Sequence, residues 1–257
     1  MQPNGDQVDV FTDVQALTVV AAQRIVALAT NAVQDHGVFA VALSGGSTPR
    51  VLYRLMATDK TIRSAIPWSK VHFFFGDERY VPPDHAESNF RMAREAMFQG
   101  LRSKGLHIHR ILGELASASE AAAEYEADLG EFFGARGLLD QGFPRLDLAL
   151  LGMGPDGHTA SLFPNSSGLR ESARWVVANW VEKFKADRIT MTLPVLNSAA
   201  EVILLVSGHE KSPVLAEVLG QAVSGPKYPV QRVRPRHGIK RWMLDATAAA
   251  SINAVPR

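Results

Sequence analysis

The sequence predicts an α/β fold whose mostly parallel sheet carries helices on both faces. Four short apolar runs each end in a small or polar loop and alternate with helix-like sequence; they cover residues 38–43, 71–75, 146–151 and 202–206. Strands that alternate with helices imply right-handed crossovers, and therefore parallel strands. Runs as continuous as VHFFF and VILLV are typical of strands that are buried on both faces.

The size and composition of the chain favour a single domain. The chain has 257 residues, of which 46% are hydrophobic, so it can bury a large core. No Pro/Gly/Ser-rich linker, low-complexity tract, charge block or internal repeat divides it. We therefore expect residues 1–257 to form one α/β domain, with the alanine-rich stretch 246–250 at the end of a terminal helix.

The longest apolar stretch, residues 17–33, is expected to be an amphipathic helix of a soluble protein. Gln23 and Arg24 interrupt it, and its apolar residues follow a helical period, so a membrane span explains it less well. The N-terminal sequence MQPNGDQVDV lacks the basic and apolar regions of a signal peptide. These features, together with the absence of cysteine, which fits a reducing compartment, predict a cytoplasmic protein.

The charge and the cysteine content exclude several classes of function. A formal net charge of +1 gives no general attraction to nucleic acid or to an anionic membrane, so neither is expected as a partner. Any bound anion has to be held locally. The chain has no cysteine, which rules out disulfides, thiolate catalysis and cysteine-ligated zinc. The basic stretch 227–241 is expected to be a solvated or site-flanking loop.

The loops that follow the four predicted strands fall on one edge of the sheet, where ligands bind near the point at which strand order reverses. The first loop has two glycines and three hydroxyl side chains before Pro49, near the start of a helix. These hydroxyls and the free helix amides can hold a phosphate, while an ordinary strand-to-helix turn is the alternative. The loop matches neither a Walker A motif nor the GxGxxG fingerprint. Its residues are Ser44, Gly45, Gly46, Ser47 and Thr48.

The third loop, GMGPDGH, is predicted to carry an acid/base residue. Its glycines allow a sharp turn, and a helix is expected to follow, with its free N–H groups directed at whatever His158 faces. A histidine at this edge is suited to proton transfer near neutral pH. Asp156 either orients His158 or caps the turn, and a purely structural role for both residues is the alternative.

The second and fourth loops add charged side chains to the same edge. Asp77, Glu78 and Arg79 directly follow a strand, where they either form a structural Asp77–Arg79 ion pair or bind a sugar hydroxyl, a water or an anion. Lys211 is expected at the start of the helix after the fourth strand. No histidine or carboxylate spacing matches a metal-binding motif, so no metal is expected. The residues considered for a metal, and expected instead in loops or at the surface, are His85, Glu87, Asn89, His107 and His109.

Six segments occur in a distinctive order: ALSGGSTP, FFGDERYVP with SNFRMA, LLGMGPDGHTASLFP, RITMTLPVLN, VSGHEKSPVL and RWMLDATAA. In this combination they resemble the 6-phosphogluconolactonase family. The resemblance implies a Rossmann-like fold, no cofactor, and hydrolysis of 6-phospho-D-glucono-1,5-lactone to 6-phospho-D-gluconate in the pentose phosphate pathway. It identifies His158 with the general base, and the SGGST loop, Arg79, Arg188 and Lys211 with residues that hold the substrate and its phosphate.

The chain departs from the family pattern in one loop. The family often has prolines between the lysine that matches Lys183 and the arginine that matches Arg188, whereas this chain has FKAD there. The shape of the loop, and with it the reach of Arg188, is therefore open.

Two rival functions are weighed against lactone hydrolysis. Glucosamine-6-phosphate isomerase/deaminases share the DGH turn but have a glutamate at the position of Phe163, whose apolar ring cannot relay a proton. A sugar-phosphate sensor would normally carry a helix-turn-helix domain, for which the roughly 35 residues before the first motif-bearing strand are too few.

The mechanism predicted from these residues begins with capture of the phosphate by residues 44–48 and cationic side chains. His158 then deprotonates a water that attacks C1, and Arg79 or a backbone amide of the glycine turn stabilises the oxyanion before the ring opens. No serine nucleophile is needed, and the sequence has no GxSxG elbow. We expect a monomer or a weak homodimer.

Overall fold

The structure, a computed structural model, describes residues 6–220 and 225–252, so the first five residues of the N-terminal sequence analysed above lie outside it. The helices are α1 (Val14–His36), α2 (Ser47–Thr58), α3 (Lys60–Ala65), α4 (Asn89–Ala96), α5 (Ala118–Arg136), α6 (Leu193–Leu196) and α7 (Ser212–Leu219). The strands are β1 (Gln7–Phe11), β2 (Phe39–Leu43), β3 (Val71–Phe75), β4 (Asp77–Arg79), β5 (His107–Ile108), β6 (Leu139–Asp140), β7 (Phe143–Pro144), β8 (Leu148–Leu151), β9 (Val176–Val181), β10 (Ala186–Met191), β11 (Glu201–Val206) and β12 (Ile239–Asp245).

Within the described residues, seven strands form the central sheet in the order β1-β12-β11-β8-β2-β3-β5. Every neighbouring pair in this sheet is parallel, which confirms the predicted parallel arrangement. The chain continues from β2 to β3 on one side and from β8 to β11 on the other, so the strand order reverses between β2 and β8. The carboxyl ends of these two strands mark the point at which open α/β sheets bind ligands.

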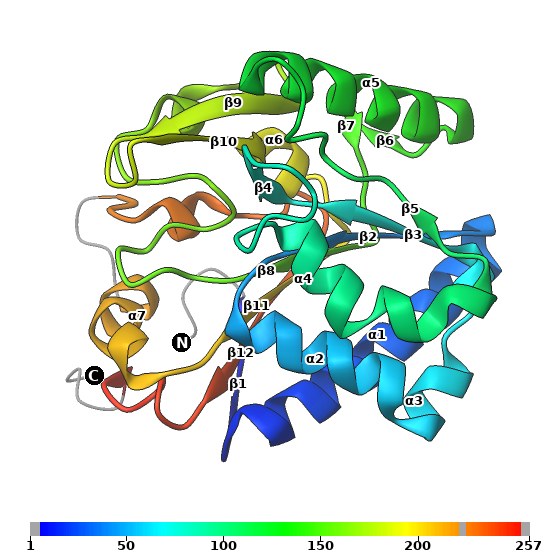
Figure 1. Ribbon diagram of the computed structural model, residues 1–257. Coiled ribbons are helices and arrows are strands. Elements are labelled where there is room, and N and C mark those ends of the chain that lie inside the picture. The colour runs from blue at the N-terminus through cyan, green and yellow to red at the C-terminus, as the bar shows by residue number, and fades with distance from the viewer. Residues whose placement is uncertain (1–5, 221–224, 253–257) are drawn as a thin grey trace.

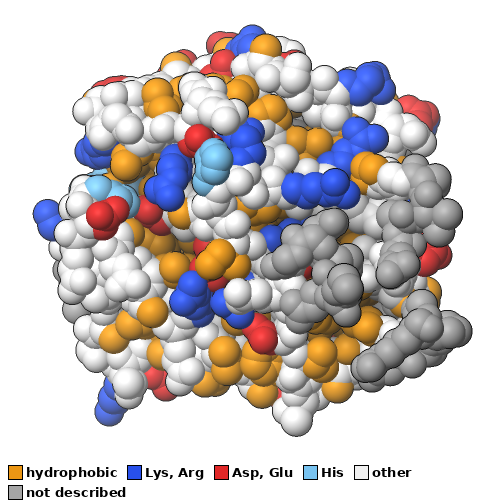
Figure 2. Space-filling view, turned by 180° about the vertical axis from the view of Figure 1, so that it is seen from behind, with side chains coloured by type: hydrophobic (Ala, Val, Ile, Leu, Met, Phe, Trp, Pro, Cys, Tyr) orange, Lys and Arg blue, Asp and Glu red, His pale blue; other side chains and the backbone are white. Residues whose placement is uncertain are grey.

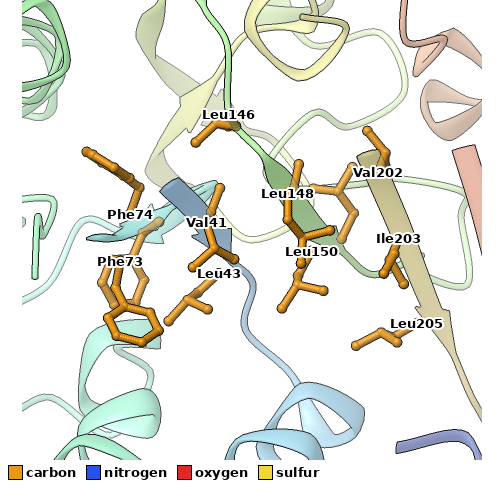
Figure 3. Close-up of a cluster of buried hydrophobic side chains, with 14 of the residues drawn as sticks. Val41, Leu43, Phe73, Phe74, Leu146, Leu148, Leu150, Val202, Ile203 and Leu205 are labelled. Carbon is orange, nitrogen blue, oxygen red and sulfur yellow. The ribbon is translucent and has the colours of Figure 1, made fainter. Parts of the chain in front are cut away.

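The four strands predicted from apolar runs, β2, β3, β8 and β11, form the middle of the hydrophobic core. Their side chains interlock in one buried cluster, in which Val41, Phe73, Leu150 and Leu205 come from the four different strands (Figure 3). Full burial of a large apolar side chain contributes about 1.5–3 kcal/mol to the hydrophobic free energy of folding. The loops that carry the predicted site residues are therefore anchored to strands that are buried along their whole length.

Both faces of the central sheet are covered, as predicted. Helices α1, α2 and α3 lie on one face, and α5 lies on the other together with a smaller antiparallel sheet of order β4-β10-β9 (Figure 1). The sequence did not predict this second sheet. Only Gly76 separates β3 from β4, so the smaller sheet starts directly from the end of a central strand.

Helix α1 shows how the local sequence sets a helix and its buried face. It begins after Asp13, whose carboxylate accepts a hydrogen bond from the Ala16 N–H at 2.8 Å, and it ends at Gly37 with φ 85°. By length and composition alone, α1 is apolar enough to cross a bilayer. Leu17 and Ile25 are instead buried in the core, as expected for the apolar face of an amphipathic helix.

The surface carries charges of both signs. On the face drawn in Figure 2, Lys and Arg side chains lie beside Asp, Glu and His side chains, with apolar side chains between them. The basic stretch 227–241 is only partly the loop that was expected. It includes a 3₁₀ turn, Pro229–Arg232, and the start of β12, where Lys240 is buried and pairs with Asp6 at 3.1 Å.

Two helices expected from the sequence are absent from the described part of the chain. Residues 158–166 form turns, because Ala160 (φ 46°) and Asn165 (φ 65°) adopt left-handed backbone conformations that interrupt a helix. Residues 246–250 also form turns, which directly follow β12; there the Asp245 carboxylate accepts hydrogen bonds from the Ala248 N–H at 2.7 Å and the Thr247 hydroxyl at 2.9 Å.

A cluster of histidines lies at the end of the central sheet around β3 and β5. His72 Nδ1 is 3.1 Å from His109 Nε2, and His109 Nδ1 is 3.0 Å from the Asp128 carboxylate. His107 stacks on His72, with ring centroids 4.3 Å apart. His107 is exposed, and His109 lies in the loop directly after β5, where this pairing leaves it half-buried; both agree with the expected surface or loop positions. Among the described residues, no group of three or more histidines and carboxylates is arranged to hold a metal ion.

This cluster predicts a pH-dependent stability. Burial, followed by the charges of His107, His109 and Arg136, lowers the pKa of His72 from 6.5 to about 4, while Asp128 acts in the opposite direction. As the pH falls below 6.5, His72 becomes protonated in the unfolded chain, whereas in the folded protein it becomes protonated only near pH 4. The free energy of unfolding therefore decreases as the pH drops through this window.

We expect the wild type to lose about 1–2 kcal/mol between about pH 7 and pH 5 through this group, measured by urea unfolding. His72→Asn, which keeps an acceptor near the position of Nδ1, should lose markedly less over the same range. Parallel pH dependence in the two proteins would show that His72 does not carry the effect.

Candidate active site

A cavity of about 280 Å³ lies at the carboxyl edge of the central sheet. Residues from all four predicted loops and from β10 line it; the predicted site residues among them are Ser44, Gly45, Gly46, Asp77, Arg79, His158, Arg188 and Lys211. Three further predicted residues, Ser47, Thr48 and Asp156, lie beside these in the chain and stand outside the lining. The four loops predicted to share one edge therefore meet there, while the roles of their residues remain predictions.

The first loop leaves polar groups open to the cavity. The Tyr53 hydroxyl fixes the backbone of Ser44, accepting from its N–H at 3.0 Å and donating to its carbonyl at 2.9 Å. The Ser44 Oγ is buried and has no hydrogen-bond partner among the described residues. Gly46 (φ 108°) precedes α2, whose first amides have no side-chain cap. An unpaired hydroxyl and free amides at a helix start favour an anion such as phosphate.

Asn89 joins the first loop to the second. A Cβ on Gly45 would lie 1.9 Å from the Asn89 Oδ1, so only glycine allows this contact. Asn89 was expected in a loop or at the surface, but it is buried at the start of α4, where its Nδ2 donates to the Asp77 carbonyl at 2.9 Å. Glu78 has a structural role, because its carboxylate accepts from the amides of Asn89 and Phe90 at 2.7 and 2.8 Å.

Two arginines stand side by side at the cavity wall. Arg79 of β4 and Arg188 of β10 are register partners in the antiparallel pair. Desolvation, followed by the positive charge of Arg79, lowers the pKa of the buried Arg188, and the Arg188 Nε has no hydrogen-bond partner among the described residues. No Asp77–Arg79 ion pair forms within the described residues: Asp77 accepts from the Ser161 hydroxyl at 2.6 Å, and the Arg79 guanidinium donates to the Glu87 carbonyl. Adjacent cations of this kind favour an anionic ligand.

The glycine turn holds His158 on several sides. The His158 Nδ1 lies 2.5 Å from the Asp156 Oδ1, and Phe163 stacks on the imidazole with ring centroids 4.1 Å apart. Gly154 leaves room for the ring, since a Cβ there would lie 2.0 Å from the His158 Cε1. Gly157, at φ 72°, packs against Tyr228. Because Nδ1 faces the carboxylate, Nε2 is the ring nitrogen left for proton transfer.

Asp156 is a charged carboxylate in this setting. Partial burial raises its pKa, but the hydrogen bond and charge of His158 and the hydrogen bond from Lys183 outweigh that effect, so its pKa lies well below the ordinary value. An ionised carboxylate accepts the Nδ1–H of an imidazole and fixes its tautomer. Asp156 also accepts from the His158 backbone N–H at 3.3 Å. These contacts are compatible with both roles that the sequence left open, orientation of His158 and capping of the turn, and the role of Asp156 stays a prediction.

The hairpin between β9 and β10 supplies side chains that the sequence analysis did not assign. Lys183 Nζ lies 3.2 Å from the Asp156 Oδ2. Phe184 lines the cavity, with the Arg188 guanidinium 5.2 Å from its ring centroid. Arg188 therefore reaches the cavity despite the missing prolines. The missing prolines drew attention to this loop in the sequence. The local sequence could not predict, however, that Lys183 contacts Asp156, which lies in another loop.

The fourth loop completes the cavity beside the first. Lys211 ends the 3₁₀ turn His209–Lys211 directly before α7, as predicted, and its side chain lines the cavity 3.7 Å from Glu210. The Thr48 hydroxyl lies 2.5 Å from the Ser207 hydroxyl. Thr48 thus ties the first loop to the fourth and places the start of α2 near Lys211.

A family model described as "Glucosamine-6-phosphate isomerases/6-phosphogluconolactonase" matches residues 12–242, and the chain belongs to this family. Within it, the chain is similar to proteins named 6-phosphogluconolactonase. It is 39% identical to one from a Nostoc species and 38% identical to one from a Synechocystis species, each match covering 96% of this chain and 98% of the relative. A solved 6-phosphogluconolactonase from Trypanosoma cruzi is 30% identical, with a TM-score of 0.82 over 98% of both chains. The family and the fold implied by the resemblance are confirmed.

The packing of the turn predicts that Gly154→Ala displaces His158 while the protein stays folded. The added methyl group would overlap the imidazole, so the ring has to leave Asp156. We expect kcat for the predicted lactone substrate to fall at least ~100-fold, because misplacing a catalytic group by about 1 Å has effects of that size.

Gly152→Ala is the matched control, since a Cβ there meets nothing within 4 Å. It should keep kcat, and any loss should appear in KM because Gly152 lines the cavity. Thermal unfolding checks that both variants fold. Equal losses of kcat in the two variants would contradict the proposed contact between Gly154 and His158.

Proposed function

We propose that this protein hydrolyses 6-phospho-D-glucono-1,5-lactone to 6-phospho-D-gluconate, in the oxidative branch of the pentose phosphate pathway. The observation that carries the proposal is an imidazole, held by a carboxylate, at the wall of a cavity that also contains two adjacent arginines and a lysine. A phosphorylated lactone needs both parts, an anion site for its phosphate and a base that activates water. The family and the names of the relatives support the same reaction.

In the proposed complex the phosphate lies at the start of α2. The Ser44 hydroxyl and the free amides of α2 donate to it, and Lys211 supplies a charge-assisted hydrogen bond. Arg188, which also lines the cavity, holds the lactone, and Asp77 accepts a hydrogen bond from a sugar hydroxyl. This placement brings the lactone carbonyl next to His158.

The chemical step moves one proton and adds one water. The His158 Nε2 takes a proton from water, and the resulting hydroxide attacks C1, while Asp156 stabilises the imidazolium. Arg79 or an amide of the glycine turn stabilises the tetrahedral oxyanion. Collapse breaks the bond between C1 and the ring oxygen, and the imidazolium returns its proton to that oxygen. We infer that the reaction proceeds in the cytoplasm, without a cofactor and without a macromolecular partner.

The rival reaction within the family is isomerisation and deamination of an amino sugar phosphate. Phe163 argues against it here, since this apolar ring stacks on His158 where a proton-relaying carboxylate would be needed. Lactone hydrolysis requires only one base and an activated water, so the same ring leaves it intact.

The direct test measures turnover of freshly prepared 6-phosphogluconolactone and, in parallel, release of ammonia from glucosamine 6-phosphate. We expect lactone turnover only, and His158→Ala should lower its kcat by about 10² to 10⁴ with a smaller change in KM. His237→Ala, at an exposed histidine, is the control and should behave as the wild type. Ammonia release without lactone hydrolysis would identify the rival reaction, and tight binding of both compounds without turnover would identify a sensor.

The two ends of the cavity should differ in their response to mutation. Lys211→Ala removes one charge-assisted contact to the phosphate, worth about 1.5–3 kcal/mol, so kcat/KM for 6-phosphogluconolactone should fall ~10-fold or more. Slow hydrolysis of unphosphorylated gluconolactone should barely change. Lys227→Ala, on an exposed lysine outside the cavity, should affect neither substrate. Equal losses on both substrates would mean that Lys211 does not bind the phosphate.

A further inference from the structure

Asp156 contacts two side chains at the same time, one through each carboxylate oxygen. Its Oδ1 lies 2.5 Å from the His158 Nδ1, and its Oδ2 lies 3.2 Å from the Lys183 Nζ. The three side chains form a linear chain of ammonium, carboxylate and imidazole. His158 and Asp156 belong to the glycine turn after β8, whereas Lys183 comes from the distant β9–β10 hairpin.

The hairpin holds Lys183 in place by its backbone. Val181 and Ala186 are register partners, so residues 182–185 form the turn. The Phe184 N–H donates to the Val181 carbonyl at 3.0 Å, and Lys185 adopts a left-handed conformation with φ 50°. A positive φ is uncommon for a lysine and fixes the direction of the chain at the turn. Phe184 also contacts the Phe163 ring edge-on at 5.7 Å, next to the stack of Phe163 on the imidazole.

Lys183 and Asp156 stand behind the cavity wall. The lining of the active-site cavity includes His158, Phe163 and Phe184, whereas Asp156 and Lys183 line a neighbouring cavity of about 580 Å³. A substrate in the active-site cavity therefore meets His158 directly and meets Lys183 only through Asp156. The Lys183 side chain is 54% exposed, and ion pairs at such exposure contribute little to stability.

We propose that Lys183 is a positioning residue. Its ammonium holds Asp156 in the orientation that accepts the Nδ1–H of His158, and its positive charge partly offsets the negative charge of that carboxylate. This inference rests on the proposed role of His158 as the general base. In this role Lys183 acts on the chemistry through Asp156, without contacting the substrate itself.

The electrostatic reason is the balance of charge around the ring. An unopposed carboxylate beside an imidazole favours the imidazolium form, and a nearby ammonium weakens that preference. The other charged groups around His158 line the cavity or share the hairpin turn; they are Asp77 and Arg79 of β4, Arg188 of β10, Lys211 before α7, and the Glu182–Lys185 pair. A change made only at Lys183 leaves all of them in place.

The test compares Lys183→Gln with Lys183→Arg and with the control Lys185→Gln. The control removes a lysine of the same turn whose ion pair, among the described residues, is with Glu182 alone. In Lys183→Gln the acidic limb of the kcat/KM profile for 6-phosphogluconolactone should move to higher pH by about half a unit to one unit. Plateau kcat should fall ~3- to 10-fold, with KM changed less than about 2-fold. Lys183→Arg should restore the wild-type profile, and Lys185→Gln should match it.

A second measurement is independent of activity. The titration of the His158 Cε1–H followed by NMR should move to higher pH in Lys183→Gln in the same way. An unchanged profile and titration, or a selective rise in KM that marks a substrate contact, would overturn the role of Lys183. Full activity in His158→Ala would instead overturn the proposed base itself, so failure of this inference is distinguishable from failure of the proposed function.

Discussion

The parallel pairing of β2 with β8 is the constraint on which the site depends. Val41 and Ala42 align with Leu148 and Ala149 in the middle of the buried sheet, so the loops leaving the two strands start side by side. One loop leads to the unprotected start of α2 and the other to the imidazole. Each loop is packed so closely that it has no room for one added methyl group. A Cβ on Gly45 in the first loop would overlap Asn89, and a Cβ on Gly154 in the second would overlap His158. The geometry of the site is therefore fixed mainly by backbone packing against a rigid core.

A local excess of positive charge is the second constraint. The chain as a whole is nearly neutral, yet Arg79 and Arg188 are adjacent, and desolvation disfavours the charge on the buried Arg188. The carboxylates of Asp77, Glu87 and Glu78 offset part of the repulsion between the two arginines, but of the three only Asp77 lines the cavity. An anionic ligand would add negative charge there, and anything that binds only the folded state stabilises it. The same arrangement that opposes folding therefore favours binding.

Sequence patterns predicted the parts of the structure that local composition determines. The four central strands are continuous apolar runs, and their parallel order brought the four loops to one edge as expected. The pattern could not predict β4, because a strand as short and polar as DER is defined only by its partner β10. Similarly, the left-handed conformations of Ala160 and Asn165 depend on tertiary contacts, so a helix was expected where turns occur. Asn89 and Lys183 were missed as site residues because the residues they meet in the site, Gly45 and Asp156, belong to other loops of the chain.

The site is assembled from two sheets that differ in how deeply they are buried. The central sheet provides the start of α2 and the imidazole, and its strands are buried in the common core. The smaller sheet provides both arginines, Phe184 and Lys183, and its hairpin turn at residues 182–185 projects at the surface. Insertions and substitutions in such a turn disturb few buried contacts. Substitutions in this hairpin can therefore reshape one wall of the cavity, while the buried strands that carry His158 and the start of α2 keep their packing.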